Sequence, residues 1–207
     1  MVLVDTADRL IESTRELLWE RGYVGTSPKA IQQRAGAGQG SMYHHFDGKP
    51  ALARAAIERT ASELTAKAEA QLSGTGTDTD TDTATDTTGG TGTPTTARTR
   101  LIAYLHRERD VLRGCPIGGL TQDSDVMADP HLRAPVTQTL AWLRSRLADV
   151  ITEGIASGEF SSTLDPHRTA TTIVAVMQGG YVLARAADDP TLFTDAIAGV
   201  LPLLGEL

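Results

Sequence analysis

The sequence predicts an all-α protein, and three observations lead to this prediction. The chain has 207 residues, of which 40% are apolar and only 4% aromatic, so its core must be built mainly from Leu, Ile, Val and Ala. Apolar residues recur every three or four positions along most of the chain, which is the spacing of one helix face. No segment shows the alternation typical of a strand. A chain of this length can bury a sizeable core, which excludes a wholly disordered protein.

The first two helices are predicted from an apolar stripe and from capping signals. The stripe should end at Gly22, and it consists of Ala7, Leu10, Ile11, Thr14, Leu17 and Leu18. A second helix should begin at Ser27-Pro28, because serine caps free amides and proline suits the first helical position, and it should end near Gly36.

A third, short helix is predicted over residues 39–46, only two residues after the second one ends. Two short helices joined by a tight turn that contains glycine form a helix-turn-helix arrangement. A long, Ala-rich helix should follow from about Lys49 to Leu72.

Residues 73–97 interrupt this pattern, because they contain 12 Thr, 5 Gly and 4 Asp but no large apolar side chain. Nothing there can offset the entropy lost on ordering, so the sequence predicts a flexible acidic linker that is dispensable for folding. The Thr-Asp alternation lacks the glutamate of a calcium-binding loop, so no calcium site is predicted.

Residues 98–207 are predicted to form helices that are separated or started by prolines. The apolar residues that mark them are Leu101, Leu105 and Leu112; Val136 to Ile151, ending before Gly158; Ala170 to Ala184; and Phe193 to Leu204. Gly179-Gly180, between Val176 and Val182, indicates either a close approach of two helices at a dimer interface or a local kink.

The net charge of −7 is unevenly distributed. Residues 1–72 carry nine basic and nine acidic side chains, whereas residues 98–207 carry ten basic and thirteen acidic ones. Between residues 25 and 60 the basic side chains outnumber the acidic ones, and they are Lys29, Arg34, Lys49, Arg54 and Arg59. A local basic surface is therefore expected on an acidic protein.

The chain shows no apolar run long enough to span a membrane and no signal-peptide pattern, so a cytoplasmic protein without a membrane partner is expected. Its single cysteine, Cys115, fits a reducing compartment. No histidine or carboxylate can be placed beside Cys115, which favours a buried structural thiol over a nucleophile; a redox-sensing role stays open. Neither a catalytic residue nor a cofactor is predicted.

The third helix carries the candidate DNA-binding surface. At about 100° per residue, Met42 and Phe46 share one face, while the opposite face and its edges present polar or small side chains. Gly40, Ser41 and His44 lie broadly opposite, Gln39 and Tyr43 lie at the edge, and His45 is a further candidate. Gly40 permits close approach, Gln39 and Ser41 suit base edges, and the others suit phosphate oxygens.

Phosphate contacts are also expected at helix starts, where free amides favour anions. Lys49 lies at the start of the long helix, and Thr26 and Ser27 lie at the start of the second. A metal site at His44, His45 and Asp47 is disfavoured, because adjacent helical side chains point about 100° apart.

These residues resemble the DNA-binding signature of tetracycline-repressor-type (TetR) transcriptional regulators over about residues 7–60. The matching residues are Thr26-Ser27, Ile31, Ala35-Gly36, Gly40 to Phe46 and Lys49-Pro50-Ala51-Leu52. The resemblance implies a homodimer of helical subunits in which three helices bind DNA, a fourth connects, and the last two pair. It also implies that Tyr43, His45 and Lys49 contact the DNA backbone, while Gln39, Gly40 and Ser41 contact bases.

The chain departs from the family pattern in three places. Gly38 stands where a capping serine or threonine is usual, and Gln32 stands where a small alanine is usual. The acidic linker replaces a short connection. Residues 114–119 and 129–133 resemble regulatory domains of family members that control multidrug-efflux genes.

The predicted organisation is a helix-turn-helix DNA-binding domain (1–48), a connecting helix (49–72), the acidic linker (73–97) and a ligand-binding and dimerisation domain (98–207). Large side chains with polar tips either line a ligand cavity or fill the core, and they are Tyr104, Trp142, Met177, Gln178 and Tyr181. The acidic balance of residues 98–207 favours a neutral or cationic ligand.

The sequence therefore predicts a dimeric repressor that leaves a palindromic DNA operator when a small molecule binds. One alternative is a helical small-molecule-binding protein or hydrolase, in which the first 60 residues are only part of a core; the sequence lacks a paired nucleophile and base, a phosphate-binding glycine loop and a metal cluster. A helical interaction module without DNA or ligand is the other.

Overall fold

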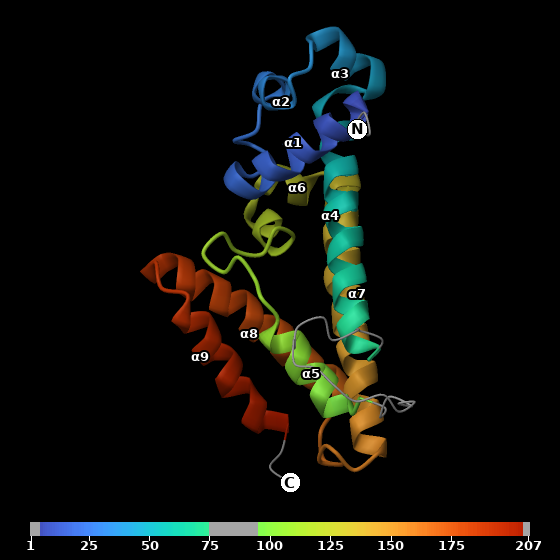
Figure 1. Ribbon diagram of the computed structural model, residues 1–207, viewed down its shortest axis with the longest axis vertical. Helices are drawn as coiled ribbons and strands as arrows, with labels where there is room; N and C mark the ends of the chain where they lie inside the picture. Colours follow the sequence, from blue (N-terminus) through green and yellow to red (C-terminus); the bar gives the residue numbers. More distant parts are fainter. Residues whose placement is uncertain (1–4, 75–94, 205–207) are drawn as a thin grey trace, which may run out of the picture.

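A computed structural model describes residues 5–74 and 95–204, and every regular element in these two ranges is a helix (Figure 1). The predicted all-α class is confirmed. None of the described helices combines the length and apolar character needed to cross a membrane.

The N-terminal unit consists of α1 (Thr6–Arg21), α2 (Pro28–Ala35) and α3 (Gln39–His45), which lie together at the top of Figure 1. The boundaries follow the local signals in the sequence. Helix α1 ends at Gly22, whose φ is +70°, and α2 ends at Gly36 in the left-handed conformation. The Ser27 hydroxyl oxygen accepts a hydrogen bond from the Ala30 amide at 3.2 Å, so the predicted cap of α2 is confirmed.

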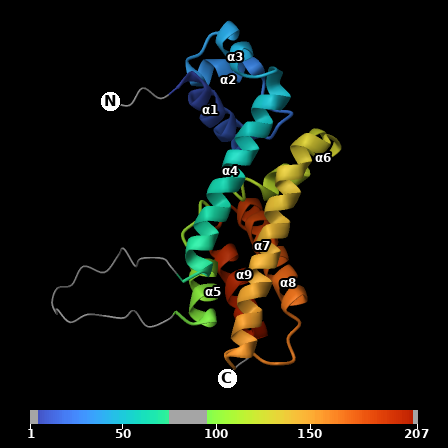
Figure 2. The ribbon, with the colours of Figure 1, turned by 90° about the vertical axis from the view of Figure 1, so that its right-hand side faces the viewer.

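Two long helices form the axis of the molecule. Helix α4 (Gly48–Leu72) leaves the N-terminal unit and runs beside α7 (Pro130–Ala156) in both views (Figures 1 and 2). Helix α7 begins at Pro130, which is earlier than the apolar residues from Val136 onward indicate, and Pro135 lies inside it.

The rest of the C-terminal unit packs against this axis. It contains α5 (Ala97–His106), η1 (Gly118–Gln122), α6 (Ser124–Ala128), α8 (Pro166–Ala187), α9 (Thr191–Val200) and η2 (Leu201–Leu204). Helix α8 packs on α7 and on α9, while α6 lies below α1 (Figure 1). The sequence did not predict the short elements η1 and α6.

One predicted helix is shorter than expected. Helix α5 ends at His106, so Leu112, which was assigned to the same stripe, lies outside it. The Arg109 guanidinium donates to the carbonyl oxygens of Leu105 at 2.8 Å and Tyr104 at 2.5 Å. Because a longer helix would pair these carbonyls with backbone amides, Arg109 terminates α5.

Three apolar clusters hold the chain together. One lies under α1, α2 and α3 and includes Leu10, Ile31 and the fully buried Met42. A second fills the C-terminal unit. The third joins the two units, because Ile57 of α4 packs with Ile117 and Val136. The units therefore share an apolar core at their junction.

The predicted acidic linker falls mostly on residues 75–94, which lie outside the described residues. On its two sides, α4 ends at Leu72 and α5 begins at Ala97, where the Thr96 hydroxyl accepts a hydrogen bond from the Thr99 amide at 3.1 Å.

Candidate DNA interface and ligand cavity

Helix α3 is anchored by one face. Met42 is fully buried, and the Gln32 side-chain amide donates to its sulfur at 3.5 Å. Gly38 precedes α3 without a side-chain cap, and its carbonyl accepts from the amides of Ser41 at 3.1 Å and Met42 at 3.3 Å. The unusual Gln32 thus contacts the anchor of α3 and does not disrupt the packing there.

The other face of α3 makes few contacts within the protein. Gln39, Gly40, His44 and His45 are exposed, Ser41 is half-buried and Tyr43 is 54% exposed. A Cβ atom built on Gly40 would meet nothing within 4 Å. Their polar side chains have no hydrogen-bond partner among the described residues. This face is therefore available to a partner molecule.

The two predicted contacts at the start of α2 differ. Ser27 is exposed, and its hydroxyl keeps a free donor beside the capping bond. Thr26 is only 1% exposed, and its hydroxyl donates to the Gly22 carbonyl at 2.7 Å. In this conformation the Thr26 hydroxyl stabilises the turn after α1, and its contact with DNA stays a prediction.

Lys49 lies at the junction of the two units. Its ammonium nitrogen is 3.8 Å from the centroid of the Tyr23 ring, a cation–π contact. Burial lowers the pKa of Lys49, while the nearby carboxylates of Asp123 and Asp125 oppose this shift.

The expected basic surface is partly neutralised. Arg34 pairs with Glu20, Arg54 with Glu58 and Arg59 with Asp8, each at 2.8 Å. The hydrogen bond from Arg34 lowers the pKa of Glu20. Of the five predicted basic residues, Lys29 and Lys49 lack a carboxylate partner within the described chain, so the basic excess is smaller than the sequence indicates.

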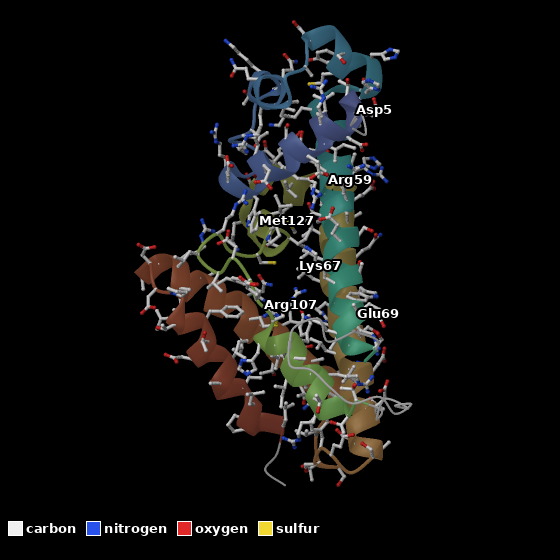
Figure 3. All side chains as sticks on the ribbon, viewed as in Figure 1. Asp5, Arg59, Lys67, Glu69, Arg107 and Met127 are labelled. Carbon is white, nitrogen blue, oxygen red and sulfur yellow. The ribbon has the colours of Figure 1, made fainter. Side chains whose placement is uncertain are left out.

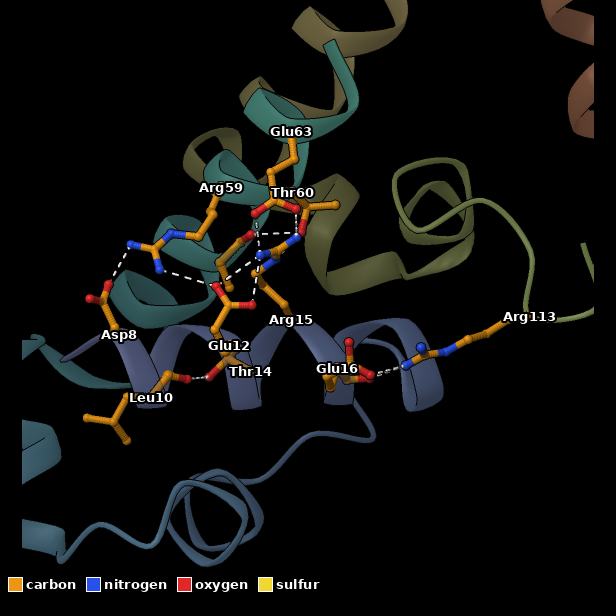
Figure 4. A network of polar contacts seen from close by, with 11 residues as sticks. Asp8, Leu10, Glu12, Thr14, Arg15, Glu16, Arg59, Thr60, Glu63 and Arg113 are labelled. Atoms are coloured by element: carbon orange, nitrogen blue, oxygen red, sulfur yellow. Dashed lines mark hydrogen bonds and ion pairs between the residues drawn. The ribbon is translucent and has the colours of Figure 1, made fainter. Parts of the chain in front are cut away.

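An ion network fixes α1 on α4 (Figure 4). Arg15 of α1 contacts Glu12 on its own helix and both Glu63 and Thr60 on α4. In the opposite direction, Arg59 of α4 donates hydrogen bonds to two carboxylates of α1, Asp8 at 2.8 Å and Glu12 at 3.2 Å. Helices α1 and α4 are therefore cross-linked by donors from each helix to acceptors on the other.

A second set of contacts joins α1 and the turn after it to residues 113–123. One carboxylate oxygen of Asp123 accepts from the amides of Tyr23 at 2.7 Å and Val24 at 3.0 Å, while its other oxygen caps α6. The Trp19 indole donates to the Gly114 carbonyl at 2.9 Å, and the Arg113 guanidinium carbon lies 3.7 Å from the centroid of the Trp19 ring. Sequence reasoning missed these residues, because the partners are about 100 positions apart.

A cavity with an empty volume of about 510 Å³, including the part that opens to solvent, lies between α4, α5, α7 and α8. All five side chains predicted to face a ligand line it, and they are Tyr104, Trp142, Met177, Gln178 and Tyr181. Cavities that bind small organic molecules have mostly apolar walls with a few polar groups, and the wall of this cavity has the same character. The residues of the wall therefore suit a small, mainly apolar ligand.

The cavity wall contains further residues that the sequence did not single out. Arg107 lines it from the segment after α5, and Figure 3 shows this residue in the middle of the molecule. Cys115 is half-buried and lines the cavity, which corrects the expectation of a fully buried thiol. Its sulfur accepts from the Gly118 amide at 3.2 Å.

Gly118 itself leaves room for Gln178, because a Cβ atom on Gly118 would lie only 2.0 Å from the Gln178 side-chain oxygen. Burial raises the pKa of Tyr104 and of Tyr181, so both phenols stay protonated at neutral pH. Across the described residues, no three His, Cys, Asp or Glu side chains are grouped so as to hold a metal ion.

Comparison with known proteins assigns both units of the chain to one family. A family model described as "Bacterial regulatory proteins, tetR family" matches residues 10–56, and one described as "Tetracyclin repressor-like, C-terminal domain" matches residues 97–200. A helix-turn-helix transcriptional regulator in the lacX 3′ region of Lactococcus lactis is 22% identical, over 90% of this chain and 87% of its own length. The Escherichia coli transcriptional repressor ComR is 34% identical over 65 residues, 31% of each chain.

Solved structures share the whole fold. Reduced NemR of Escherichia coli superposes with a TM-score of 0.78 at 20% identity, covering 97% of this chain and 98% of that one. A TetR transcriptional regulator from Chloroflexus aurantiacus gives a TM-score of 0.75 at 25% identity, covering 95% of this chain and 92% of that one.

Proposed function

Because the chain belongs to the TetR family of ligand-responsive DNA-binding transcriptional regulators, and is not an enzyme, we propose that it is a homodimeric repressor whose α3 helices bind a palindromic operator and which a small molecule releases. In this proposal residues 1–48 bind DNA, residues 49–72 connect, and residues 98–207 bind the effector and dimerise. Such a regulator acts on the genome, which assigns it to the cytoplasm.

Helix α3 lies in the major groove in this proposal. Gly40 lets the helix approach the bases, and Gln39 and Ser41 contact base edges. Tyr43, His44, His45 and Lys49 contact phosphates, together with Ser27 at the start of α2. The observation that carries this assignment is the exposed face of α3, whose polar side chains have no hydrogen-bond partner among the described residues.

Dimerisation is assigned to α8 and α9. Val182 and Leu183 of α8 are 66% and 55% exposed, which is high for large apolar side chains. Gly179 on the same helix is open, whereas Gly180 packs within the chain, since a Cβ atom there would lie 3.0 Å from Phe193. A second copy covering this face would place two α3 helices about 34–36 Å apart, or further by one turn of DNA.

The segment 113–123 supports a short path between effector and DNA. Cys115 and Ile117 line the cavity, and Asp123 at the other end holds the turn between α1 and α2. A ligand that displaces this segment changes the position of α2 and α3. An effector that binds the displaced arrangement more tightly shifts the population, and such coupling is typically about 1–3 kcal/mol.

Fluorescence-anisotropy titration of the DNA upstream of the gene tests the proposal. Wild-type protein should bind this DNA with an affinity that falls steeply with salt, because phosphate contacts release counterions. The matched variants are Ser41→Ala on the exposed face and Glu58→Ala in an exposed pair on α4. A loss of affinity with Ser41→Ala and not with Glu58→Ala supports the assignment, whereas absence of binding by the wild-type protein rejects it.

A further inference from the structure

The charge of the cavity wall indicates what kind of molecule the cavity holds. Fifteen described residues line the cavity, and Arg107 is the one Lys, Arg, Asp or Glu among them. None of the lining residues is an Asp or a Glu. The cavity is therefore locally positive, although the C-terminal block as a whole is negative.

Arg107 has no partner for its charge. Its Nε atom is shielded from solvent and has no hydrogen-bond partner within the described chain. None of the ion pairs or side-chain hydrogen bonds of the described residues involves its guanidinium; its contact is with the Tyr104 ring, whose centroid is 5.0 Å away. The residue as a whole is half-buried, so the shielding applies to this one nitrogen. A shielded N–H group without an acceptor costs free energy, so the side chain is suited to accept an anion.

Other partly or largely covered arginines of the C-terminal unit have partners that Arg107 lacks. Arg100, Arg113 and Arg146 are also largely covered, and each pairs with a glutamate. Arg109, the neighbour of Arg107 on the Tyr104 ring, donates to carbonyl oxygens and not to a carboxylate. Two guanidinium groups thus share one aromatic ring without a negative charge, and burial lowers the pKa of Arg109.

The other residues of the cavity wall indicate the polarity of the rest of the ligand. Trp142, Leu143 and Met177 supply an apolar surface, and the Gln178 amide, which has no hydrogen-bond partner in the described part of the chain, supplies a polar group. A planar guanidinium suits a carboxylate, which it can bind through two parallel hydrogen bonds.

We propose that the effector is a small organic carboxylate, whose acid group pairs with Arg107 and whose apolar body lies against Trp142 and Met177. This inference rests on the proposed function, because it assigns the chemical class of the effector of that regulator. It replaces the neutral or cationic ligand that the overall charge of residues 98–207 favours.

The test compares acids, amides and amines that share the same hydrocarbon group. Isothermal titration measures the affinity of each compound for the free protein without DNA. The probes are 3-phenylpropionate, 3-phenylpropionamide and 3-phenylpropylamine, with equivalent triplets of shorter aliphatic and of naphthyl bodies. In at least one triplet the acid should bind the wild-type protein at least about tenfold more tightly than the amide and the amine. Arg107→Gln should abolish this preference, Arg107→Lys should retain part of it, and Arg144→Gln, a change at an exposed residue of α7, should preserve it.

Three results would overturn the assignment: an amide or amine that binds as tightly as its acid, an acid preference that survives Arg107→Gln, or no binding of any acid. If Arg107→Gln does not fold, the comparison of Arg107→Lys with the wild type decides. Operator binding by the wild-type protein without effector is measured separately. Failure there rejects the proposed regulator, whereas failure of the acids alone rejects only the class of effector.

Discussion

At position 40, the requirements of folding and of DNA binding differ. A side chain at this position would point into open space, so the folded protein does not require glycine there. Glycine costs about 1 kcal/mol relative to alanine within a helix.

We therefore expect Gly40→Ala to leave the melting temperature unchanged or raise it, and to weaken operator binding, because the new methyl group holds α3 away from the base edges. Thermal unfolding and anisotropy titration check the two effects independently. A drop in melting temperature together with intact affinity would contradict this role of Gly40.

The side chains of α3 should divide into those that contact the DNA backbone and those that contact bases. Lys49→Ala is expected to weaken binding to all sequences and to reduce the salt slope by about one, and Tyr43→Phe should weaken binding uniformly. Gln39→Ala and Ser41→Ala should instead change the preference among operator variants. Binding constants across a panel of single-base operator variants provide the measurement, and a uniform loss for all four proteins would reject the division.

At the scale of elements, the network between α1 and α4 makes the N-terminal unit sensitive to acid. The hydrogen bond from Arg15 lowers the pKa of Glu63 below its ordinary value of 4.5. A lowered folded-state pKa contributes stability that is present above pH 4.5 and is lost as the pH falls through the lowered value.

Glu63→Gln should therefore reduce the free energy of unfolding by about 0.5–1 kcal/mol at neutral pH, since the pair is half-exposed. The difference from the wild type should shrink as the pH falls below about 4. Urea unfolding at several pH values checks this, with Glu58→Gln, from an exposed pair within α4, as the control. A difference that stays constant with pH would show that the ion pair is not its cause.

Asp123 caps α6 and holds the turn after α1 with the same carboxylate. Asp123→Ala should lower stability by about 1 kcal/mol, as the loss of an N-cap does, and should also weaken the response of operator binding to effector. Asp165→Ala is the matched control, because Asp165 caps α8 entirely within the C-terminal unit. If both variants leave the effector response intact, Asp123 does not connect the units.

The elements that the sequence predicted well are those with local signals. Ser27, Gly22 and Gly36 act on their own helix ends, so capping rules were sufficient. The end of α5 was missed because the Arg109 side chain folds back on carbonyls of the preceding turn. The contacts of Asp123 and the burial of Thr26 depend on packing between segments, which periodicity does not contain.

At the scale of the whole molecule, total charge is a poor guide to local charge. Three of the five basic residues expected to form a basic surface pair with carboxylates of α1 and α4. Conversely, the cavity wall in the acidic half of the chain carries an unpaired arginine. Both facts depend on which side chains face one another in space.

The uncovered face of α8 makes the oligomeric state testable. Val182→Glu should leave the fold of each chain intact, because this side chain is 66% exposed, but should shift the protein to monomers and weaken operator binding. Sedimentation at micromolar concentration measures the change. Ile102→Glu, at an exposed apolar residue of α5, is the control, and an unchanged dimer with Val182→Glu would place the interface elsewhere.

The exposed face of α3 is proposed to bind specific DNA. Selection of bound duplexes from random DNA by the purified wild-type protein at low ionic strength, beside a Ser41→Ala and Gln39→Ala double variant, tests it most directly. The wild type should enrich an inverted repeat with half-sites about 10 base pairs apart, or further by a turn, and the double variant should enrich a different sequence or none. Recovery of no enriched sequence by the wild type, or of the same repeat by both proteins, would contradict it.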